Sequence, residues 1–213
     1  MKYKGIIFDL DGVICHTDHY HYLAWKALAD KLGIYFDETI NNRLRGVSRM
    51  ESLEIILEKH KGNPFTKEEK LAFALEKNEL YRESLVQMSK ADLSEEVKET
   101  LIQLRGQGLK LVIGSSSKNA PLILNQIGLL DFFDAISDGN NITNSKPHPE
   151  VFLLAAEYIS LPESDCLVVE DAKAGIEAAI SAGMDCAAIG DAVFSGLGTY
   201  NLETFSDLLR VVK

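Results

Sequence analysis

The sequence predicts an α/β protein: a doubly wound, Rossmann-like parallel sheet with an all-helical domain inserted after its first strand. Three observations lead to this prediction. A strand-like apolar run opens the chain, the apolar spacing over residues 17–89 is purely helical, and short apolar runs alternate with helical segments from residue 90 onward. Such alternation is typical of a parallel sheet with helices on both faces. We therefore expect residues 1–16 and 90–213 to form a Rossmann-like core and residues 17–89 to form a helical cap.

The first strand and the helical insertion have recognisable boundaries. The run KGIIF at residues 4–8 is apolar and β-branched, and it ends at an acidic residue, as a buried strand does when its carboxyl end carries function. In the insertion, apolar residues at helical spacing precede Gly33 and Gly62, which are typical helix ends. Thr66 and Glu69 form a capping-box pattern that predicts the start of a long helix.

After residue 90 the alternation of helix and strand repeats several times. Ser94 is the predicted N-cap of a helix that ends near Gly106 or Gly108. The remaining strands are predicted at residues 109–114, 134–137, 166–170 and 186–190, with helices at 119–128, 149–159 and 174–183. Strands and helices in this order predict a parallel sheet whose ligands bind at the carboxyl ends of the strands.

Composition limits the classes of partner. The chain has 213 residues, of which 46% are hydrophobic, and its net charge is −10 with a pI near 5.0. Because this charge repels nucleic acid and anionic membrane, we expect neither as a partner, and an anionic substrate needs a locally positive pocket. Three cysteines without CxxC spacing argue against a disulfide framework. With no apolar run long enough to span a membrane, we expect a cytoplasmic monomer.

Polar residues follow several predicted strands, where a buried strand would not otherwise need them. The group consists of Asp9, Asp11, Ser115, Glu170 and Asp171, with Lys146 in a nearby predicted loop. Carboxylates crowded at one sheet edge raise each other's pKa unless a cation lies among them, and an all-oxygen ligand set selects Mg²⁺. Phosphoryl transfer is the reaction class that uses every member of the group. Each acidic residue alone could equally cap the next helix, but that alternative explains all six together poorly.

The motifs "DLDGV", Ser115, "SKPHPE" and "EDAKAGIEAAISAG" resemble the four ordered motifs of the haloacid dehalogenase superfamily of Mg²⁺-dependent phosphotransferases, which carry a helical cap after the first motif. The resemblance implies that Asp9 is the nucleophile that becomes an aspartyl phosphate and that Asp11 is the general acid and base. It implies that Ser115 and Lys146 bind the transferring phosphoryl group. The metal ligands implied are Asp9, the backbone carbonyl of Asp11, and Asp171, with Glu170 beside them.

Three further segments, "TDHYHYLAWKALADKLGI", "LRGVSRMESL" and "SSSKNAP", resemble the hexose-phosphate mutases of this superfamily. The resemblance implies an isomerase that interconverts β-D-glucose 1-phosphate and glucose 6-phosphate through an aspartyl phosphate and glucose 1,6-bisphosphate. Substrate contacts implied around the sugar or the hinge are Thr17, His21, Trp25, Gly46, Val47, Ser48, Arg49, Ser52 and Lys77. Around the second, non-reacting phosphate the resemblance places Arg49 with Ser117, Lys118 and Asn119.

Several alternatives remain open at this point. A sugar-phosphate phosphatase uses the same nucleophile, and a catalytically idle relative is disfavoured because the acidic residues and Lys146 are intact. His21 and Trp25 can be packing residues, "GVSR" a simple turn, and Lys118 a solvated surface lysine. The histidines at 16, 19 and 21 share no helix face and lack further zinc ligands, so we expect no zinc site. His16 stands where the superfamily usually has aspartate, and either a pH-dependent hinge or a neutral replacement fits it.

Overall fold

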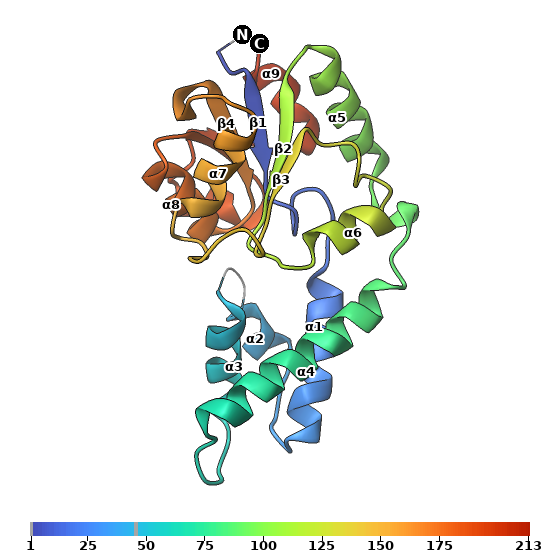
Figure 1. The fold of residues 1–213 in the computed structure, drawn as a ribbon, viewed down its shortest axis with the longest axis vertical. Coiled ribbons are helices and arrows are strands. Elements are labelled where there is room, and N and C mark those ends of the chain that lie inside the picture. The colour runs from blue at the N-terminus through green and yellow to red at the C-terminus, as the bar shows by residue number, and fades with distance from the viewer. Residues whose placement is uncertain (1, 45–46) are drawn as a thin grey trace. The chain divides into compact units, whose positions relative to one another are not determined.

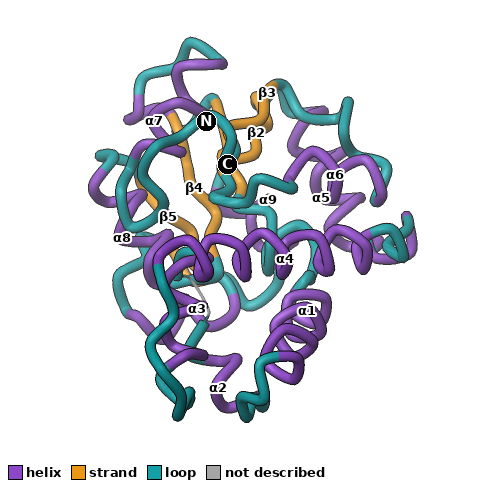
Figure 2. Tube along the Cα trace, turned by 60° about the horizontal axis from the view of Figure 1, so that its bottom comes forward, coloured by secondary structure: helices purple, strands orange, loops and turns teal. Residues whose placement is uncertain are grey.

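In a computed structural model, residues 2–44 and 47–213 are described, and the chain divides into two units. One unit, the core, ends at His16 and resumes at Met88; the other, the cap, spans Thr17–Gln87. The second boundary follows Gln87, whereas the sequence placed it after Ser89. Figures 1 and 2 show the strands gathered in the core, while the cap consists of helices and loops.

A six-stranded sheet forms the centre of the core. Its strands are β1 (Gly5–Phe8), β2 (Lys110–Gly114), β3 (Ala135–Ser137), β4 (Cys166–Glu170), β5 (Asp185–Ala188) and β6 (Tyr200–Asn201). They pair in parallel in the order β3-β2-β1-β4-β5-β6, which confirms the predicted doubly wound sheet. The chain order reverses beside β1, between β1 and β4, which is where a doubly wound sheet binds its ligands.

The register of the sheet aligns the carboxyl ends of β1, β2 and β4. Phe8, the last residue of β1, pairs with Ile113 on one side and Val169 on the other. Asp9, which follows β1, and Glu170, the last residue of β4, therefore lie side by side. Every residue of β1 and β4 is buried, which explains their nearly continuous apolar sequences.

Helices cover both faces of the sheet (Figure 1). In the core they are α5 (Glu95–Gly106), α6 (Ala120–Gln126), α7 (Glu150–Tyr158), α8 (Lys173–Ser181) and α9 (Leu208–Val211). The apolar sides of α7 and α8 pack with those of β1, β2 and β4 in one hydrophobic cluster, which includes Ile7, Val112, Phe152 and Ile176. As predicted, Ser94 caps α5, because its side chain accepts the N–H of Val97. The short β6 and α9 had no clear signal in the sequence.

The cap contains four helices among its described residues: α1 (Asp18–Lys31), α2 (Glu38–Asn42), α3 (Arg49–Leu57) and α4 (Lys67–Leu85). The predicted capping box of Thr66 and Glu69 is present at the start of α4, and a second one, Ser48 with Glu51, starts α3. Trp25, Leu28, Phe36 and Leu53 belong to a hydrophobic cluster that gives the cap its own core.

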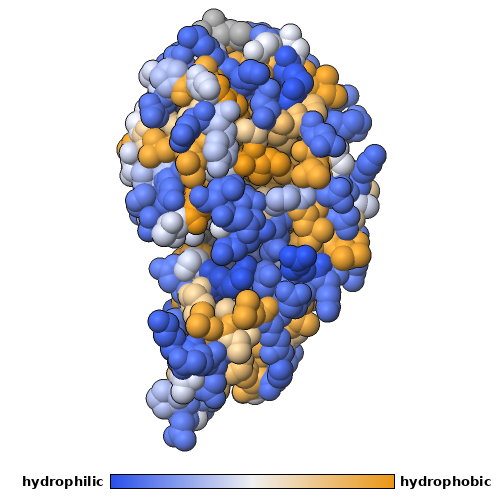
Figure 3. Space-filling view, viewed as in Figure 1, coloured by the Kyte–Doolittle hydropathy of each residue, from blue (hydrophilic) through white to orange (hydrophobic). Residues whose placement is uncertain are grey.

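Three further observations concern membrane-spanning helices, the surface and the cysteines. Among the described residues, no helix is long and apolar enough to cross a membrane. Apolar and polar side chains are interspersed over the face of the core seen in Figure 3. Cys15, Cys166 and Cys186 are all buried and not joined in disulfides, as the sequence predicted.

Candidate active site

Asp9 lies at the carboxyl end of β1, where its backbone continues the sheet. Its N–H donates to the carbonyl of Val169 at 3.0 Å, and its side chain is held against Lys146, with Nζ 2.5 Å from Oδ1. Only 8% of Asp9 is exposed. The strand therefore places the Asp9 carboxylate at the edge of the sheet, where one of its two oxygens, Oδ1, accepts a hydrogen bond from the Lys146 ammonium.

Lys146 reaches the same place from the loop that precedes α7. Its Nζ lies 2.5 Å from Asp9 Oδ1 and 2.6 Å from Glu170 Oε1, and 4.7 Å from the centre of the Phe152 ring. The lysine side chain is only 9% exposed, and those of Asp9 and Glu170 are 11% and 2% exposed. Lys146 thus places one ammonium group, a donor suited to phosphoryl oxygens, within an otherwise acidic group of side chains.

The electrostatics of the group follow from burial and crowding. Burial raises the pKa of Asp9 well above its usual range, and the carboxylates of Glu170, Asp171 and Asp11 raise it further, against the opposing effect of Lys146. Burial alone would lower the pKa of Lys146, but the charges of Asp9 and Glu170 outweigh burial and raise it. Four carboxyl groups thus surround one ammonium group, and a cation bound among them would favour the ionised form of Asp9.

Glu170, the last residue of β4, is almost fully buried at 1% exposure. Its Oε1 meets Lys146, and its Oε2 accepts the N–H of Ala172 at 2.8 Å. The carboxyl group occupies the space where a side chain on Gly175, in the first turn of α8, would lie. Glycine at this position is what allows the helix to approach the carboxylate.

Gly12 brings Asp171 close to the loop after β1. It has φ +88°, a conformation that favours glycine, and a Cβ at this position would collide with the Asp171 carboxylate. The N–H of Gly12 donates to the Cys15 carbonyl at 2.7 Å, which closes the turn that carries Asp11. Asp11 is half-buried at this turn, and Asp171 is half-buried after β4.

The donor set of this site suits a hard divalent cation. Carboxylate oxygens from Asp9, Glu170 and Asp171 and the carbonyl of Asp11 are the ligand types that Mg²⁺ prefers, and the excess negative charge favours a cation. Over residues 2–44 and 47–213, however, no three carboxylate, imidazole or thiolate groups already converge as metal ligands. Glu170 instead contacts Lys146 and Ala172, so its role as a ligand stays a prediction.

The segment after β2 contains two serine hydroxyl groups, and the oxygen of each accepts a hydrogen bond from a backbone N–H of the same segment. Ser115 Oγ accepts the N–H of Ser117 at 3.1 Å, and Ser117 Oγ accepts the N–H of Asn119 at 3.2 Å. Each hydroxyl hydrogen can therefore point away from the turn and donate to an anion. Ser115 and Asn119 are buried and Lys118 is exposed. The alternative that Lys118 is a solvated surface lysine therefore stays open.

Within the cap, two of the predicted substrate residues, His21 and Trp25, lie around the buried ammonium of a third, Lys77. Lys77, only 3% exposed, places Nζ 2.8 Å from His21 Nδ1 and over the Trp25 ring, 4.9 Å from its centre. Tyr81, which the sequence did not single out, stacks on His21 with ring centres 4.0 Å apart and lies under the same ammonium. Burial, followed by the charges of Lys77 and Arg49, lowers the pKa of His21 well below its usual range. His21 is thus neutral and accepts from Lys77.

Arg49 is the first residue of α3 and is held by α4. Its Nη2 donates to Asn78 Oδ1 at 2.9 Å, and Asn78 is a second cap residue that the sequence did not single out. Ser48 caps α3 through its side chain, so "GVSR" is at least partly a helix start. Among the other predicted contacts, Thr17 and Ser52 are buried and Val47 is exposed. Gly46 lies outside the described residues.

Two other sequence-based ideas can be placed in the structure. Trp25 is 3% exposed and belongs to the hydrophobic cluster of the cap. It is therefore a packing residue, which is the alternative to a sugar contact. His16 is exposed at the end of the first core segment, and the hinge hypothesis for it stays a hypothesis.

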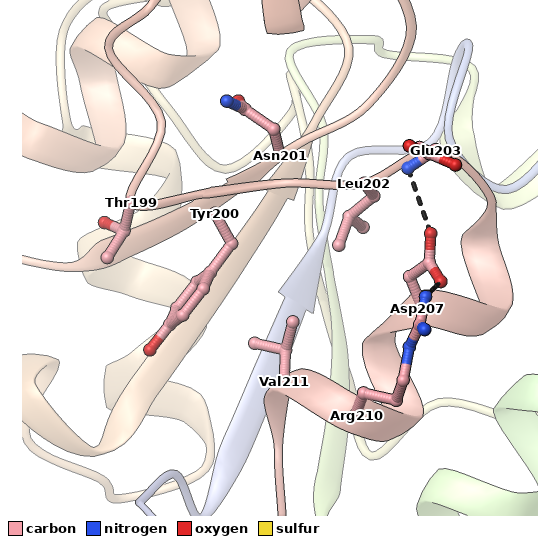
Figure 4. Close-up of a pocket in the computed structure, with 8 residues that line it drawn as sticks. All are labelled: Thr199, Tyr200, Asn201, Leu202, Glu203, Asp207, Arg210 and Val211. Carbon is pink, nitrogen blue, oxygen red and sulfur yellow. Dashed lines mark hydrogen bonds and ion pairs between the residues drawn. The ribbon is translucent and has the colours of Figure 1, made fainter.

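A cavity of about 710 Å³ lies elsewhere in the core, beside β6 and α9 (Figure 4). Its lining contains one cation among the described residues, Arg210, and Figure 4 shows this side chain paired with Asp207. The Asp207 carboxylate also accepts the N–H of Glu203 at 3.0 Å. None of the predicted site residues lines this cavity.

Comparison with known proteins gives consistent results. A family model described as haloacid dehalogenase-like hydrolase matches residues 3–183. The chain is 41% identical over 188 residues to the beta-phosphoglucomutase of Bacillus subtilis, covering 88% of this chain and 83% of the relative. It is 32% identical over 186 residues to a fructose-1-phosphate phosphatase of Escherichia coli, covering 86% and 95%. The crystal structure of a beta-phosphoglucomutase from Clostridium difficile matches with a TM-score of 0.87 and 39% identity, covering 97% of this chain and 93% of that one.

Proposed function

Because the chain belongs to the haloacid dehalogenase-like hydrolase family, we propose that it is a phosphoryl-transferring isomerase with β-phosphoglucomutase activity. It interconverts β-D-glucose 1-phosphate and glucose 6-phosphate. The observation that carries this proposal is the Asp9–Lys146–Glu170 group at the carboxyl ends of β1 and β4. The similarity to the Bacillus subtilis enzyme, at 41% identity, supports the choice of substrate.

In the proposed reaction, Asp9 is the nucleophile. The cycle starts from the aspartyl phosphate: the 6-hydroxyl of β-glucose 1-phosphate attacks phosphorus, Asp11 takes the hydroxyl proton, and the bond from phosphorus to the Asp9 oxygen breaks, which gives glucose 1,6-bisphosphate. The bisphosphate then binds in the opposite orientation. The freed Asp9 carboxylate attacks the phosphorus at position 1, the bond to the departing sugar oxygen breaks, and Asp11 gives that oxygen its proton, which releases glucose 6-phosphate and restores the aspartyl phosphate.

Lys146 and Ser115 supply positive charge and a hydrogen-bond donor for the phosphoryl oxygens. Their effect is largest when negative charge spreads over those oxygens in the transition state. Membership of the family implies a divalent metal. We propose Mg²⁺, held by Asp9, the Asp11 carbonyl, Glu170 and Asp171, which would add positive charge at the same oxygens.

Isomerisation needs a second, non-reacting phosphate to be bound while the first is transferred. In the cap, burial and then the charges of Lys77 and Arg49 lower the pKa of His21, and the same two positive charges favour an anionic ligand. In the core, the hydroxyl of Ser117 can donate to an anion, and Lys118 and Asn119 follow it. We propose these residues as phosphate contacts and His21, Thr17 and Ser52 as sugar contacts.

A phosphatase is the second candidate, because the Escherichia coli fructose-1-phosphate phosphatase is also similar over most of the chain. The two activities differ in whether water or a sugar hydroxyl discharges Asp9. We also propose that the enzyme acts as a monomer in the cytoplasm, which three buried cysteines without a disulfide support.

The test is formation of glucose 6-phosphate from each anomer of glucose 1-phosphate, with Mg²⁺ and a trace of glucose 1,6-bisphosphate, followed by a coupled dehydrogenase assay. We expect conversion of the β anomer and little of the α anomer. Failure to convert either anomer would remove the proposed activity.

A further inference from the structure

The loop that carries Lys146 is irregular and mostly exposed, although its lysine must be placed accurately. Between β3 and α7, residues 139–149 contain no helix or strand in the described structure, and most of them are exposed. The Lys146 ammonium nevertheless lies within 2.6 Å of two buried carboxylates. The backbone of Lys146 itself has only a long contact, 3.4 Å, from its N–H to Ser116 Oγ. A turn bond from the N–H of His148 to the Ser145 carbonyl at 3.0 Å spans the lysine, and a side chain outside the loop adds further contacts before it.

Glu150 is that side chain and anchors the loop. It is the first residue of α7, and its Oε1 accepts the N–H of Thr143 at 2.8 Å. Its Oε2 accepts both the N–H of Asn144 at 2.9 Å and the Asn144 side-chain amide at 3.0 Å. One carboxylate thus gathers three N–H groups from the residues just before Lys146.

The anchor is rigid because the helix behind it is rigid. Val151 and Phe152, the next residues of α7, are fully buried in the core cluster, and the Phe152 ring also faces the Lys146 ammonium. A carboxylate at the first position of a helix is favoured by the helix dipole. Glu150 therefore connects a fixed element of the core to the loop, four residues from the lysine that the loop delivers.

Glu150 is ionised at neutral pH. The backbone N–H groups of Thr143 and Asn144 are the main causes that lower its pKa, with smaller contributions from the Asn144 side chain and His148. Hydrogen bonds to an ionised acceptor are stronger than those between neutral groups. Three such bonds hold the loop more firmly than a neutral side chain of the same shape could.

We propose that Glu150 is a positioning residue for phosphoryl transfer: it fixes the 143–146 backbone so that Lys146 meets Asp9 and Glu170. This inference rests on the proposed function only in that Lys146 takes part in phosphoryl transfer. It does not depend on which acceptor, sugar or water, discharges Asp9.

Glu150→Gln tests the proposal, because glutamine keeps the shape and removes the charge and one acceptor. Glu157→Gln is the matched control, since it removes the same charge from an exposed position on the same helix. We expect Glu150→Gln to lower kcat about 10-fold for both isomerisation and acyl-phosphate hydrolysis, because loss of a residue that orients a site residue has an effect of this size elsewhere. KM should change less than about 2-fold. The control should match the wild type.

A purely structural role would lower stability without this kinetic pattern, so a second measurement separates the two. If Glu150 acts through Lys146, adding Glu150→Gln to Lys146→Arg should cost little further activity, because the interaction is already lost. Additive losses, or an unchanged kcat in Glu150→Gln, would overturn the proposal. Acyl-phosphate hydrolysis reports on Asp9 and Lys146 even in an enzyme that makes no glucose 6-phosphate. A failed mutase assay would therefore remove the proposed function but leave this test valid.

Discussion

Two buried lysines, one in each unit, are stabilised in different ways. Lys146 in the core lies between the carboxylates of Asp9 and Glu170, at 2.5 and 2.6 Å. Lys77 in the cap contacts neutral His21 at 2.8 Å and the faces of two aromatic rings. Both side chains have an aromatic ring nearby, and Lys146 in addition contacts two carboxylates, so its ammonium belongs to an acidic group of side chains.

We infer different tasks from this difference. In the core, the ion pairs hold the ammonium beside Asp9, the proposed nucleophile. In the cap, burial and then the charges of Lys77 and Arg49 lower the pKa of His21. If the core performs the chemistry and the cap selects an anion, substitutions in the two units should have different effects.

The largest expected effect is loss of the nucleophile in the core. Asp9→Asn should reduce every phosphoryl-transfer activity by roughly four orders of magnitude, as removal of a nucleophile or its partner does in other enzymes. The fold should persist, because one charge is removed from a crowded acidic group. Steady-state assays beside Asp131→Asn, an exposed aspartate of the same unit, check this. Substantial turnover by Asp9→Asn would contradict the assignment.

The corresponding change in the cap should affect binding rather than chemistry. Arg49→Ala removes one charged hydrogen-bond donor, so we expect glucose 1,6-bisphosphate to bind about 10- to 150-fold more weakly, from about 1.5–3 kcal/mol. Hydrolysis of small acyl phosphates should be spared. Arg43→Ala, an exposed cap arginine paired with Glu58, is the control. Equal losses on both substrates would place Arg49 outside phosphate recognition.

A smaller effect is expected where the core helix α8 approaches Glu170. Gly175→Ala would push the Glu170 carboxylate away and remove one partner of Lys146. We expect kcat to fall about 10-fold and the free energy of unfolding to fall by about 1–3 kcal/mol. Gly106→Ala is the control, because a Cβ there meets nothing within 4 Å. Activity and unfolding curves that match the control would show that Glu170 tolerates the displacement.

The smallest effect concerns the pH dependence of stability. The pKa of His21 is lowered in the folded protein, so below the ordinary histidine value of about 6.5 the unfolded chain binds a proton that the folded chain does not. Stability from this residue is therefore present above pH 6.5 and is lost as the pH falls below it. Between pH 7.5 and 5.5 the wild type should lose about 1 kcal/mol more than His21→Gln. Chemical denaturation at both pH values, with exposed His19→Gln as the control, measures this difference; equal losses would contradict a His21 that stays neutral in the folded protein.

The fold and the acidic group could be predicted because both leave local signals. Buried parallel strands have apolar runs, and Asp9, Ser115 and Glu170 stand where those runs end. Glu150 and Asn78 could not be found in this way. They act through contacts with a loop or a neighbouring helix, and an acidic residue at a helix start or an amide on a polar helix is common in any protein.

Short elements at the sheet edge also escaped prediction for a physical reason. β6 has only Tyr200–Asn201, and α9 only Leu208–Val211, so neither is long enough to show a periodic pattern. Tyr81 escaped because an aromatic residue on a helix usually packs in a core, and only its position against His21 and Lys77 distinguishes it.

In the proposed function, the cap makes this enzyme a mutase rather than a phosphatase. The most direct test is the ratio of glucose 6-phosphate to inorganic phosphate formed from β-glucose 1-phosphate in a single reaction, with Mg²⁺ and a trace of glucose 1,6-bisphosphate. We predict that glucose 6-phosphate forms much faster than phosphate is released. Stoichiometric release of phosphate, with no glucose 6-phosphate, would contradict the claim and assign the chain to the sugar-phosphate phosphatases.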